Sequence, residues 1–528
     1  MQHDTPNEAD LNAEDDAALR DVPVLPHAPR HGERVELDIE RLGAAGEGEG
    51  ALVLRVGPER ALKRYVVAVR KAMVGDRVRA IIESRRRGRY TARVDEVLRP
   101  AAGRVAPRCP HFGAREEPGR GCGGCTLQAL DYPAQLTVKR DLVQRAMANR
   151  GLDPALVAPV RGAEDPWRYR NKMEFTFGDD RERRFALGLF PTGWHNEVIA
   201  LTTCHLVSTV TAGVVPRVRD WAEARGLSTY RPRDDRGFLR QLTIREGKRT
   251  DERLVELVTS PDVAVETVSG PRQAEEVARE LLTAVAGFAE ELGGRVSSAW
   301  WTRHVAIAGQ ATRLESTLVA GTPVFNDELL LPDGSALRFG IHPRAFFQPN
   351  PRQAEVLVAE VLARLGAART VLDLYCGTGT LALCVARSVD HVVGVEIVAD
   401  AIDNAVANAR ANGLDNVTFL VGDVGEVLRE HADAPWRAEV DAVVVDPPRA
   451  GLMPKAVEQL AAIAPPRIVY VSCSPASLAR DIVALRAAGY EVEGAIQPVD
   501  LFPHTFHVEN VVTLRRTSDA ALIPASEG

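Results

Sequence analysis

Alternating hydrophobic and polar residues mark the region from residue 31 to residue 100 as a series of short β-strands. Alternation with period two places every second side chain on one face, as in a strand with one buried side. The strands are separated by glycine-rich turns and cover Arg34–Glu40, Ala51–Arg55, Arg64–Val67, Asp76–Glu83 and Tyr90–Asp95. This pattern predicts a small, five-stranded, OB-like β-barrel.

The central region, residues 101–340, mixes strand and helix patterns and predicts an α+β domain. Trp167–Ala200 and Leu239–Thr259 read as antiparallel strands, and residues 262–293 read as one amphipathic helix. Basic residues alternate with apolar ones in these strands, so some of them are expected to face a polyanion: Arg170, Lys172, Arg240 and Arg245.

From residue 341 to residue 518, buried strands alternate with helices. Thr370–Leu374 is followed by a glycine turn and a helix, and further strands end near Glu396, Asp423, Asp446 and Cys473. This order predicts a doubly wound, Rossmann-like α/β sheet, with a ligand site outside the carboxyl ends of the strands.

The remaining segments are tails. Residues 1–30 are acidic, rich in proline and alanine and without apolar periodicity, which predicts disorder, and residues 519–528 form a second tail. No apolar run is long enough to span a membrane and no signal peptide is evident, so we expect a cytoplasmic monomer without a membrane partner.

Charge is distributed unevenly along the 528 residues. The net charge is −7, yet residues 51–108 hold sixteen lysines and arginines against five acidic residues. A polyanion-binding face is one interpretation, and a solvated arginine-rich loop is the other.

Seven cysteines make an odd number, which in a reducing compartment indicates metal binding or catalysis. Cys122 and Cys125 lie close together in a glycine-rich loop, Cys109 precedes them and Cys204 follows far along the chain. Four such thiolates suit an iron–sulfur cluster or a structural zinc.

The glycine turn after Thr370–Leu374 reads Asp373-Leu-Tyr-Cys-Gly-Thr-Gly379. A dinucleotide fingerprint would place its third glycine at position 382, which is alanine, and the Gly-Lys-Ser/Thr of a P-loop is absent. Glu396, at the end of the next strand, could accept hydrogen bonds from a ribose diol.

This turn resembles the first motif of S-adenosylmethionine (SAM) dependent methyltransferases. Together with Asp446-Pro-Pro-Arg-Ala-Gly451, the strand ending at Cys473 and Leu501-Phe-Pro-His504-Thr-Phe-His507-Val-Glu509, it resembles the bacterial RNA uracil-C5 (5-methyluridine) methyltransferases that carry a TRAM barrel. The resemblance implies Cys473 as nucleophile and Glu509 as general base. It also implies a set of cofactor-binding residues: Gln348, Tyr375, Thr380, Glu396, Asp423 and Asp446.

The same resemblance implies a [4Fe–4S] cluster on Cys109, Cys122, Cys125 and Cys204. Twelve residues separate Cys109 from Cys122, more than this family usually has, and Arg115–Arg120 reads as an inserted loop. Zinc or an empty site therefore stay open. The implied partner is structured RNA, ribosomal RNA in preference to transfer RNA.

Uracil chemistry explains why a cysteine and a base are needed. C5 is too weak a nucleophile to take a sulfonium methyl group until a thiolate adds at C6, and the C5 proton must afterwards be removed. Alternatives are a transfer RNA enzyme, a cytosine-C5 or amino-group RNA methyltransferase, and a non-catalytic RNA-binding iron–sulfur protein. His504 and His507 could orient Glu509, contact RNA or satisfy backbone groups.

Overall fold

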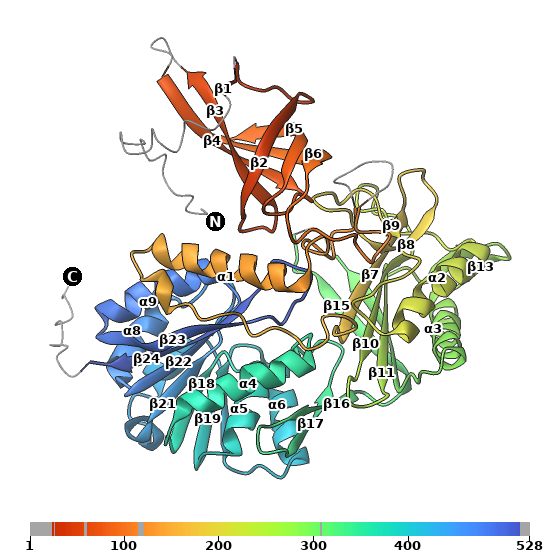
Figure 1. Ribbon diagram of the computed structural model, residues 1–528. Helices are drawn as coiled ribbons and strands as arrows, with labels where there is room; N and C mark the ends of the chain where they lie inside the picture. The colour runs from red at the N-terminus through yellow and green to blue at the C-terminus, as the bar shows by residue number, and fades with distance from the viewer. Residues whose placement is uncertain (1–23, 26, 57–60, 114–120, 307–308, 518–528) are drawn as a thin grey trace. The chain divides into compact units, whose positions relative to one another are not determined.

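A computed structural model describes residues 24–25, 27–56, 61–113, 121–306 and 309–517 (Figure 1). The chain forms two compact units, Met1–Gly121 with Cys125–Asp131, and Cys122–Gly124 with Tyr132–Gly528. The predicted C-terminal tail, the inserted loop at residues 115–120 and most of the predicted N-terminal tail lie outside the described residues. Within the latter, Val24–Leu25 (β1) form a short strand that pairs in parallel with Val53 and Leu54, where the sequence predicted disorder.

The first unit contains the predicted barrel. Its strands are β2 (Arg34–Leu42), β3 (Gly48–Val56), β4 (Ala61–Arg70), β5 (Arg77–Arg86) and β6 (Arg89–Arg99). They pair in the order β3-β2-β5-β6-β4, and β4 pairs again with β3, which closes the sheet. Along β2, every second residue from Val35 to Ile39 is buried, so the alternation of the sequence corresponds to the inside and outside of the barrel.

Most arginines on the outside of the barrel pair with acids on neighbouring strands. Arg34 Nε lies 2.7 Å from Asp95 Oδ2, and Arg77 Nη1 lies 2.9 Å from Asp38 Oδ2. Arg85 and Arg86, the last residues of β5, and Arg87, in the turn to β6, are exposed and have no carboxylate partner among the described residues. These three arginines therefore add uncompensated positive charge to this end of the hairpin.

The second unit begins with helix α1 (Tyr132–Ala148) and a central seven-stranded sheet. The sheet order is β15-β14-β11-β10-β7-β8-β9. Its strands are β7 (Lys172–Asp179), β8 (Phe185–Leu189), β9 (Ile199–Ala200), β10 (Leu239–Glu246), β11 (Arg253–Thr259), β14 (Ser298–Val305) and β15 (Arg313–Gly321). Helices α2 (Thr209–Ala224) and α3 (Ala274–Glu291) pack together beside it.

Residues 262–293 do not form a single helix. Ala264–Thr267 (β12) and Gly270–Gln273 (β13) form a hairpin before α3. Gly270 has φ +98°, a backbone conformation that reverses the chain and that a helix does not contain. The prediction of one helix was therefore wrong over its first third.

The C-terminal part is the predicted doubly wound sheet, in the order β20-β19-β18-β21-β22-β24-β23. β18 (Thr370–Leu374), β19 (His391–Glu396), β20 (Val417–Val421), β21 (Ala442–Val445) and β22 (Arg467–Ser472) are parallel. β24 (Glu509–Arg516) is antiparallel to β22, and β23 (Tyr490–Val499) pairs antiparallel with β24 and so runs in the same direction as β22. The helices are α4 (Pro351–Leu365), α5 (Thr380–Ala386), α6 (Ala399–Ala411), α7 (Val424–Glu430), α8 (Pro454–Ile463) and α9 (Pro475–Ala487).

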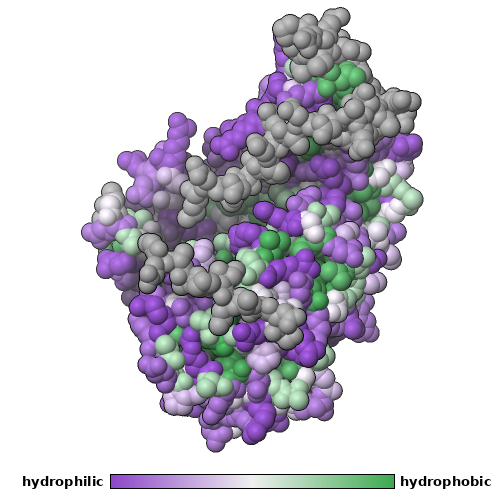
Figure 2. All heavy atoms as spheres, turned by 90° about the vertical axis from the view of Figure 1, so that its left-hand side faces the viewer, coloured by the Kyte–Doolittle hydropathy of each residue, from purple (hydrophilic) through white to green (hydrophobic). Residues whose placement is uncertain are grey.

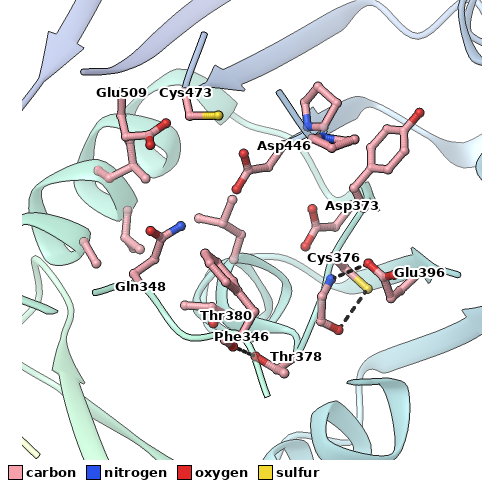
Figure 3. Close-up of a pocket in the computed structure, with 18 of the residues that line it drawn as sticks. Phe346, Gln348, Asp373, Cys376, Thr378, Thr380, Glu396, Asp446, Cys473 and Glu509 are labelled. Carbon is pink, nitrogen blue, oxygen red and sulfur yellow. Dashed lines mark hydrogen bonds between the residues drawn. The ribbon is translucent and has the colours of Figure 1, made fainter. Parts of the chain in front are cut away.

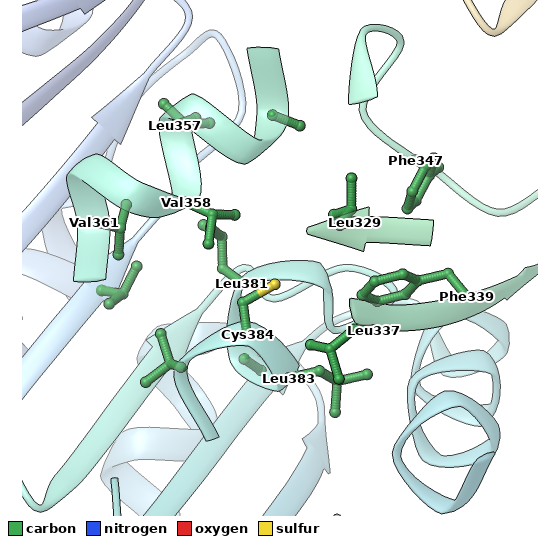
Figure 4. Packing of buried hydrophobic residues seen from close by; sticks show 14 of the residues in the cluster. Leu329, Leu337, Phe339, Phe347, Leu357, Val358, Val361, Leu381, Leu383 and Cys384 are labelled. Carbon is green, nitrogen blue, oxygen red and sulfur yellow. The ribbon is translucent and has the colours of Figure 1, made fainter. Parts of the chain in front are cut away.

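A hydrophobic cluster joins this sheet to the hairpin β16 (Phe325–Leu330) and β17 (Ala336–Ile341) (Figure 4). Phe339 of β17, Leu357 of α4 and Cys384 of α5 are all buried in it. The face in Figure 2 is mostly hydrophilic, with hydrophobic residues in small separate patches. Within the described part of the chain, no helix has the length and apolar character needed to cross a membrane.

Candidate active site

A pocket in the second unit lies at the carboxyl ends of β18, β19, β21 and β22 (Figure 3). Its volume is about 560 Å³, within the usual size of a small-molecule site. Of the eight residues that the sequence singles out for catalysis or cofactor binding, seven line it: Gln348, Tyr375, Thr380, Glu396, Asp446, Cys473 and Glu509. Residues from six separate segments therefore meet at one edge of the sheet, as the strand order predicts.

The glycine turn forms one wall of the pocket. Tyr375, Gly377 and Gly379 all have positive φ, and Gly379 caps the N-terminus of α5. A Cβ atom at Gly379 would lie 3.0 Å from Ala405 Cβ, so a larger residue has no room. The Gly377 N–H donates to Glu396 Oε2 at 3.1 Å, which holds the turn against the end of β19.

Asp373 lies beneath this turn and points toward the pocket (Figure 3). It is 1% exposed, and neither of its carboxyl oxygens accepts a hydrogen bond from a described residue. Burial and the neighbouring Asp446 raise its pKa well above the usual value. Two buried acceptors without donors are costly unless a ligand supplies donors, so Asp373 joins the candidate ligand-binding residues. The sequence placed it in the motif but gave it no role.

Gln348 reaches the pocket from the segment that precedes α4. Asn171 Nδ2 donates to the Gln348 carbonyl at 2.9 Å. Arg245 donates to the carbonyls of Pro343 and Ala345, both at 2.8 Å. Arg245 is 4% exposed, so this member of the basic set does not face a polyanion but fixes the segment that carries Gln348.

Cys473 and Glu509 lie at the same end of the pocket (Figure 3). Cys473 follows β22 directly, and Glu509 is the first residue of β24. Ser472 pairs with Asn510 across these two antiparallel strands, and Asn510 Nδ2 donates to the Ser472 carbonyl at 3.1 Å. A thiol and a carboxyl group from distant parts of the chain are thus held side by side by the sheet.

Burial determines the protonation of this end of the pocket. It raises the pKa of Glu509 to about 8, with a further contribution from the charge of Asp446. Burial raises the pKa of Asp446 to about 7. The pKa of Cys473 rises to about 11 through burial and the two nearby carboxylates, Glu509 and Asp446. Near neutral pH, Glu509 and Cys473 are therefore mainly protonated before a substrate binds.

The two histidines before Glu509 have different surroundings. His504 is buried, and its backbone N–H donates to Gln135 Oε1 at 2.9 Å. His507 lines the pocket, with its Nδ1 3.3 Å from Arg449 Nη2. Burial lowers the pKa of both imidazoles to about 3, so both are neutral. Sequence reasoning did not single out Arg449, although the Asp446-Pro-Pro-Arg-Ala-Gly451 motif contains it.

Asp423 does not line the pocket. It is the N-cap of α7, where its Oδ1 accepts from the Glu426 N–H at 3.2 Å. It still lies close enough to Tyr375 to contribute, after burial, to raising the pKa of that phenol to about 12. The assignment of Asp423 to the cofactor-binding residues stays a prediction.

The four cysteines predicted to bind a cluster are divided between the two units. Cys109 and Cys125 belong to the first unit, and Cys122 and Cys204 belong to the second. Across the described ranges, no three histidine, cysteine, aspartate or glutamate side chains form a group that could hold a metal ion. Burial raises the pKa of the Cys109 thiol above its usual value. The cluster therefore stays a prediction that rests on the resemblance.

Comparisons with known proteins identify RNA methyltransferases as relatives of this chain. Residues 302–517 match the family model described as tRNA (uracil-5-)-methyltransferase. An uncharacterized RNA methyltransferase of Protochlamydia amoebophila is 37% identical over 452 residues, covering 83% of this chain and 98% of the relative. One from Caldanaerobacter subterraneus subsp. tengcongensis is 33% identical over 488 residues, covering 92% and 99%.

Among solved structures, similarity extends to the Pyrococcus abyssi tRNA (uracil-54, C5)-methyltransferase in complex with S-adenosyl-L-homocysteine. The TM-score is 0.65 at 26% sequence identity, and the match covers 91% of this chain and all of the other. The family model, the sequence relatives and the structural neighbour are all described as RNA methyltransferases. The chain belongs to the RNA (uracil-5-)-methyltransferase family, enzymes that take their methyl group from SAM.

Proposed function

We propose that this enzyme methylates C5 of a uridine in structured RNA through a covalent intermediate, with Cys473 as the nucleophile and Glu509 as the general base. The observation that supports this most directly is the placement of these two groups side by side at the end of the pocket, on neighbouring antiparallel strands. A target base inside a folded RNA would have to leave its stack to reach them.

The pocket suits SAM. The two unpartnered oxygens of Asp373 and the amide of Gln348 offer hydrogen-bonding groups, and the glycine turn leaves open space beside Glu396. When bound, SAM supplies an electrophilic methyl group. The residues that would hold it are the pocket residues Gln348, Tyr375, Thr380, Glu396 and Asp446, together with Asp373.

The protein's own groups would carry the remaining steps. The Cys473 thiol first loses its proton to solvent. The resulting thiolate bonds to C6 of the uracil, and the electron pair of the C5–C6 double bond moves toward O4 as an enolate. C5 then takes the methyl group. The Glu509 carboxylate removes the proton from C5, the double bond re-forms, and the bond between C6 and the Cys473 sulfur breaks.

The rate of this last step should depend on pH in a defined direction. Only the ionised form of Glu509 can accept the proton, and its raised pKa of about 8 means that this form disappears as pH falls. We expect resolution of the RNA–protein adduct to slow about tenfold for each unit below pH 8. A pH-jump experiment on preformed adduct measures this directly. A profile centred near pH 4.5 would show that the base is exposed in the complex.

Ribosomal RNA, and 23S RNA in particular, is the proposed substrate, because a TRAM-like barrel together with the cysteine segment resembles the ribosomal RNA enzymes of the family. Transfer RNA is the second candidate, favoured by the Pyrococcus abyssi structure, whose name specifies uracil-54 of a transfer RNA. The [4Fe–4S] cluster stays a prediction from the resemblance, and no step above depends on it.

Nucleoside mass spectrometry tests the reaction and the substrate together. Ribosomal and transfer RNA from a strain lacking this gene would be analysed before and after treatment with purified protein and SAM. We expect 5-methyluridine to return in ribosomal RNA. Its return in transfer RNA alone would establish the second candidate, and methylated cytosine or adenine in place of 5-methyluridine would overturn the uracil assignment.

A further inference from the structure

The loop of residues 500–508, which leads directly into Glu509, forms several hydrogen bonds with side chains from elsewhere in the second unit. Asn350 Nδ2 donates to the Leu501 carbonyl at 3.1 Å, and the Tyr169 hydroxyl donates to the Pro503 carbonyl at 3.0 Å. Phe502 and His507 of the same loop line the pocket beside Glu509. The position of this loop therefore determines the wall around the proposed base.

Helix α1 supplies the strongest of these contacts through one stripe of residues. Its buried positions are Gln135, Lys139, Val143 and Met147, spaced four residues apart. Val143 and Met147 pack in the hydrophobic core beneath the sheet. Toward the N-terminus the stripe becomes polar, and there it faces residues more than 360 positions away in the sequence.

Lys139 and Asp500 form a fully buried ion pair, both with 0% side-chain exposure. Lys139 Nζ donates to Asp500 Oδ1 at 2.6 Å and to the Phe502 carbonyl at 3.0 Å. The Phe502 N–H donates back to Asp500 Oδ1 at 3.1 Å, and the Tyr132 hydroxyl donates to Asp500 Oδ2 at 3.0 Å. The Lys139 ammonium thus links Asp500 to Phe502 and holds the first turn of the loop together.

Gln135 holds the middle of the loop in the same way. Its Oε1 accepts from the His504 N–H, and its Nε2 lies 3.1 Å from His504 Nδ1. His504 has φ +67°, an unfavourable conformation for a residue with a side chain, and its ring stacks on Trp167 with centroids 3.7 Å apart. A strained residue persists only where its surroundings fix it.

Stability alone does not explain a buried lysine here. The cost of removing two charges from water roughly cancels their attraction, and apolar residues of the same size commonly serve a core as well or better. The ion pair also fixes the conformation of the loop, because the Lys139 ammonium binds one carboxylate oxygen and one backbone carbonyl of the same loop.

We propose that Tyr132, Gln135 and Lys139 of α1 are positioning residues that fix the loop 500–508, and thereby the wall around Glu509, for the proton-removal step. This inference rests on the proposed roles of Cys473 and Glu509. It assigns a catalytic consequence to a helix of which no residue lines the pocket.

Lys139→Met tests the proposal on the full-length protein and the RNA class identified above. We expect turnover to fall by roughly 100-fold, as for a reacting group misplaced by about 1 Å, while SAM affinity stays unchanged. The covalent RNA–protein adduct should accumulate, and the pH midpoint of its resolution should move down from that of the wild type, because a loosened loop admits water to Glu509. A purely structural role would produce neither the adduct nor the change in midpoint.

A second variant keeps the test valid if Lys139→Met folds poorly. Lys139→Met/Asp500→Asn leaves no uncompensated buried charge, and we expect it to fold with a melting temperature near that of the wild type and still to resolve the adduct slowly. Arg145→Met is the matched control, since Arg145 pairs with Asp141 on the outer face of the same helix. It should behave as the wild type.

Two outcomes separate this inference from the proposed function. If Glu509→Gln traps an adduct but both Lys139 variants resolve theirs at the wild-type rate, the positioning role is wrong and the proposed function stands. If Glu509→Gln traps no adduct, the assignment of the base itself fails, and this inference fails with it.

Discussion

Replacing Cys473 by alanine is expected to lower 5-methyluridine formation by at least roughly 10⁴-fold, the scale of loss when a covalent nucleophile is removed. Without the thiolate, no bond forms at C6 and C5 never gains the electron density needed to take a methyl group. SAM binding should survive, because Cys473 lies at the far end of the pocket from the glycine turn (Figure 3). Nucleoside mass spectrometry and calorimetric SAM titration measure the two effects separately.

The matched control is Cys384→Ala. Cys384 is fully buried in the hydrophobic cluster of α5, and burial raises the pKa of its thiol to about 12, so it should be dispensable for the chemistry (Figure 4). Retained turnover in Cys473→Ala would contradict the nucleophile assignment. It would favour an amino-group methyltransferase, in which the Asp446-Pro-Pro segment holds the substrate amine.

Glu509→Gln is expected to have the second largest effect and a different signature. Addition of Cys473 and methyl transfer do not require the carboxylate, but removal of the C5 proton does. The reaction should therefore stop with RNA bound covalently to the protein, and resolution should slow by roughly 10²–10⁴-fold. A denaturing gel with labelled RNA would show the adduct as a band of reduced mobility.

Glu493→Gln serves as the control for this variant. Glu493 lies on the adjacent strand β23, where its carboxylate pairs with Arg467 and Arg515 at the surface. It should release product normally. If Glu509→Gln also releases product at the wild-type rate, another group removes the proton, and Asp446 would be the next candidate because it lines the same pocket.

The architecture was largely predictable because its signals are local. The alternation in β2 and the run Thr370–Leu374 each identify a strand without reference to any other part of the chain. The positions of Cys473 and Asp446 at strand ends, combined with the strand order, then place them at one edge of the sheet. Both the barrel and the doubly wound sheet were confirmed by the structure.

What the sequence did not reveal depends on contacts between distant residues. Arg245 looks like a surface cation in its strand, but it is buried because its two acceptors belong to a segment about a hundred residues later. The contacts of Lys139 with Asp500 and Phe502 are equally invisible to a local pattern. For Asp423 a local pattern is ambiguous, since a short acidic side chain before a helix serves as a cap as readily as it binds a ligand.

The antiparallel pairing of β22 and β24 also determines which parts of the chain are free to change in length. Because Ser472 pairs with Asn510, backbone hydrogen bonds set the separation of Cys473 and Glu509, and the 35 residues between them do not. Insertions in α9, or at the bend near Gly494 where the register of β23 shifts, would leave that separation unchanged. Homologous enzymes can therefore diverge in the size of this segment while the two reacting groups stay in place.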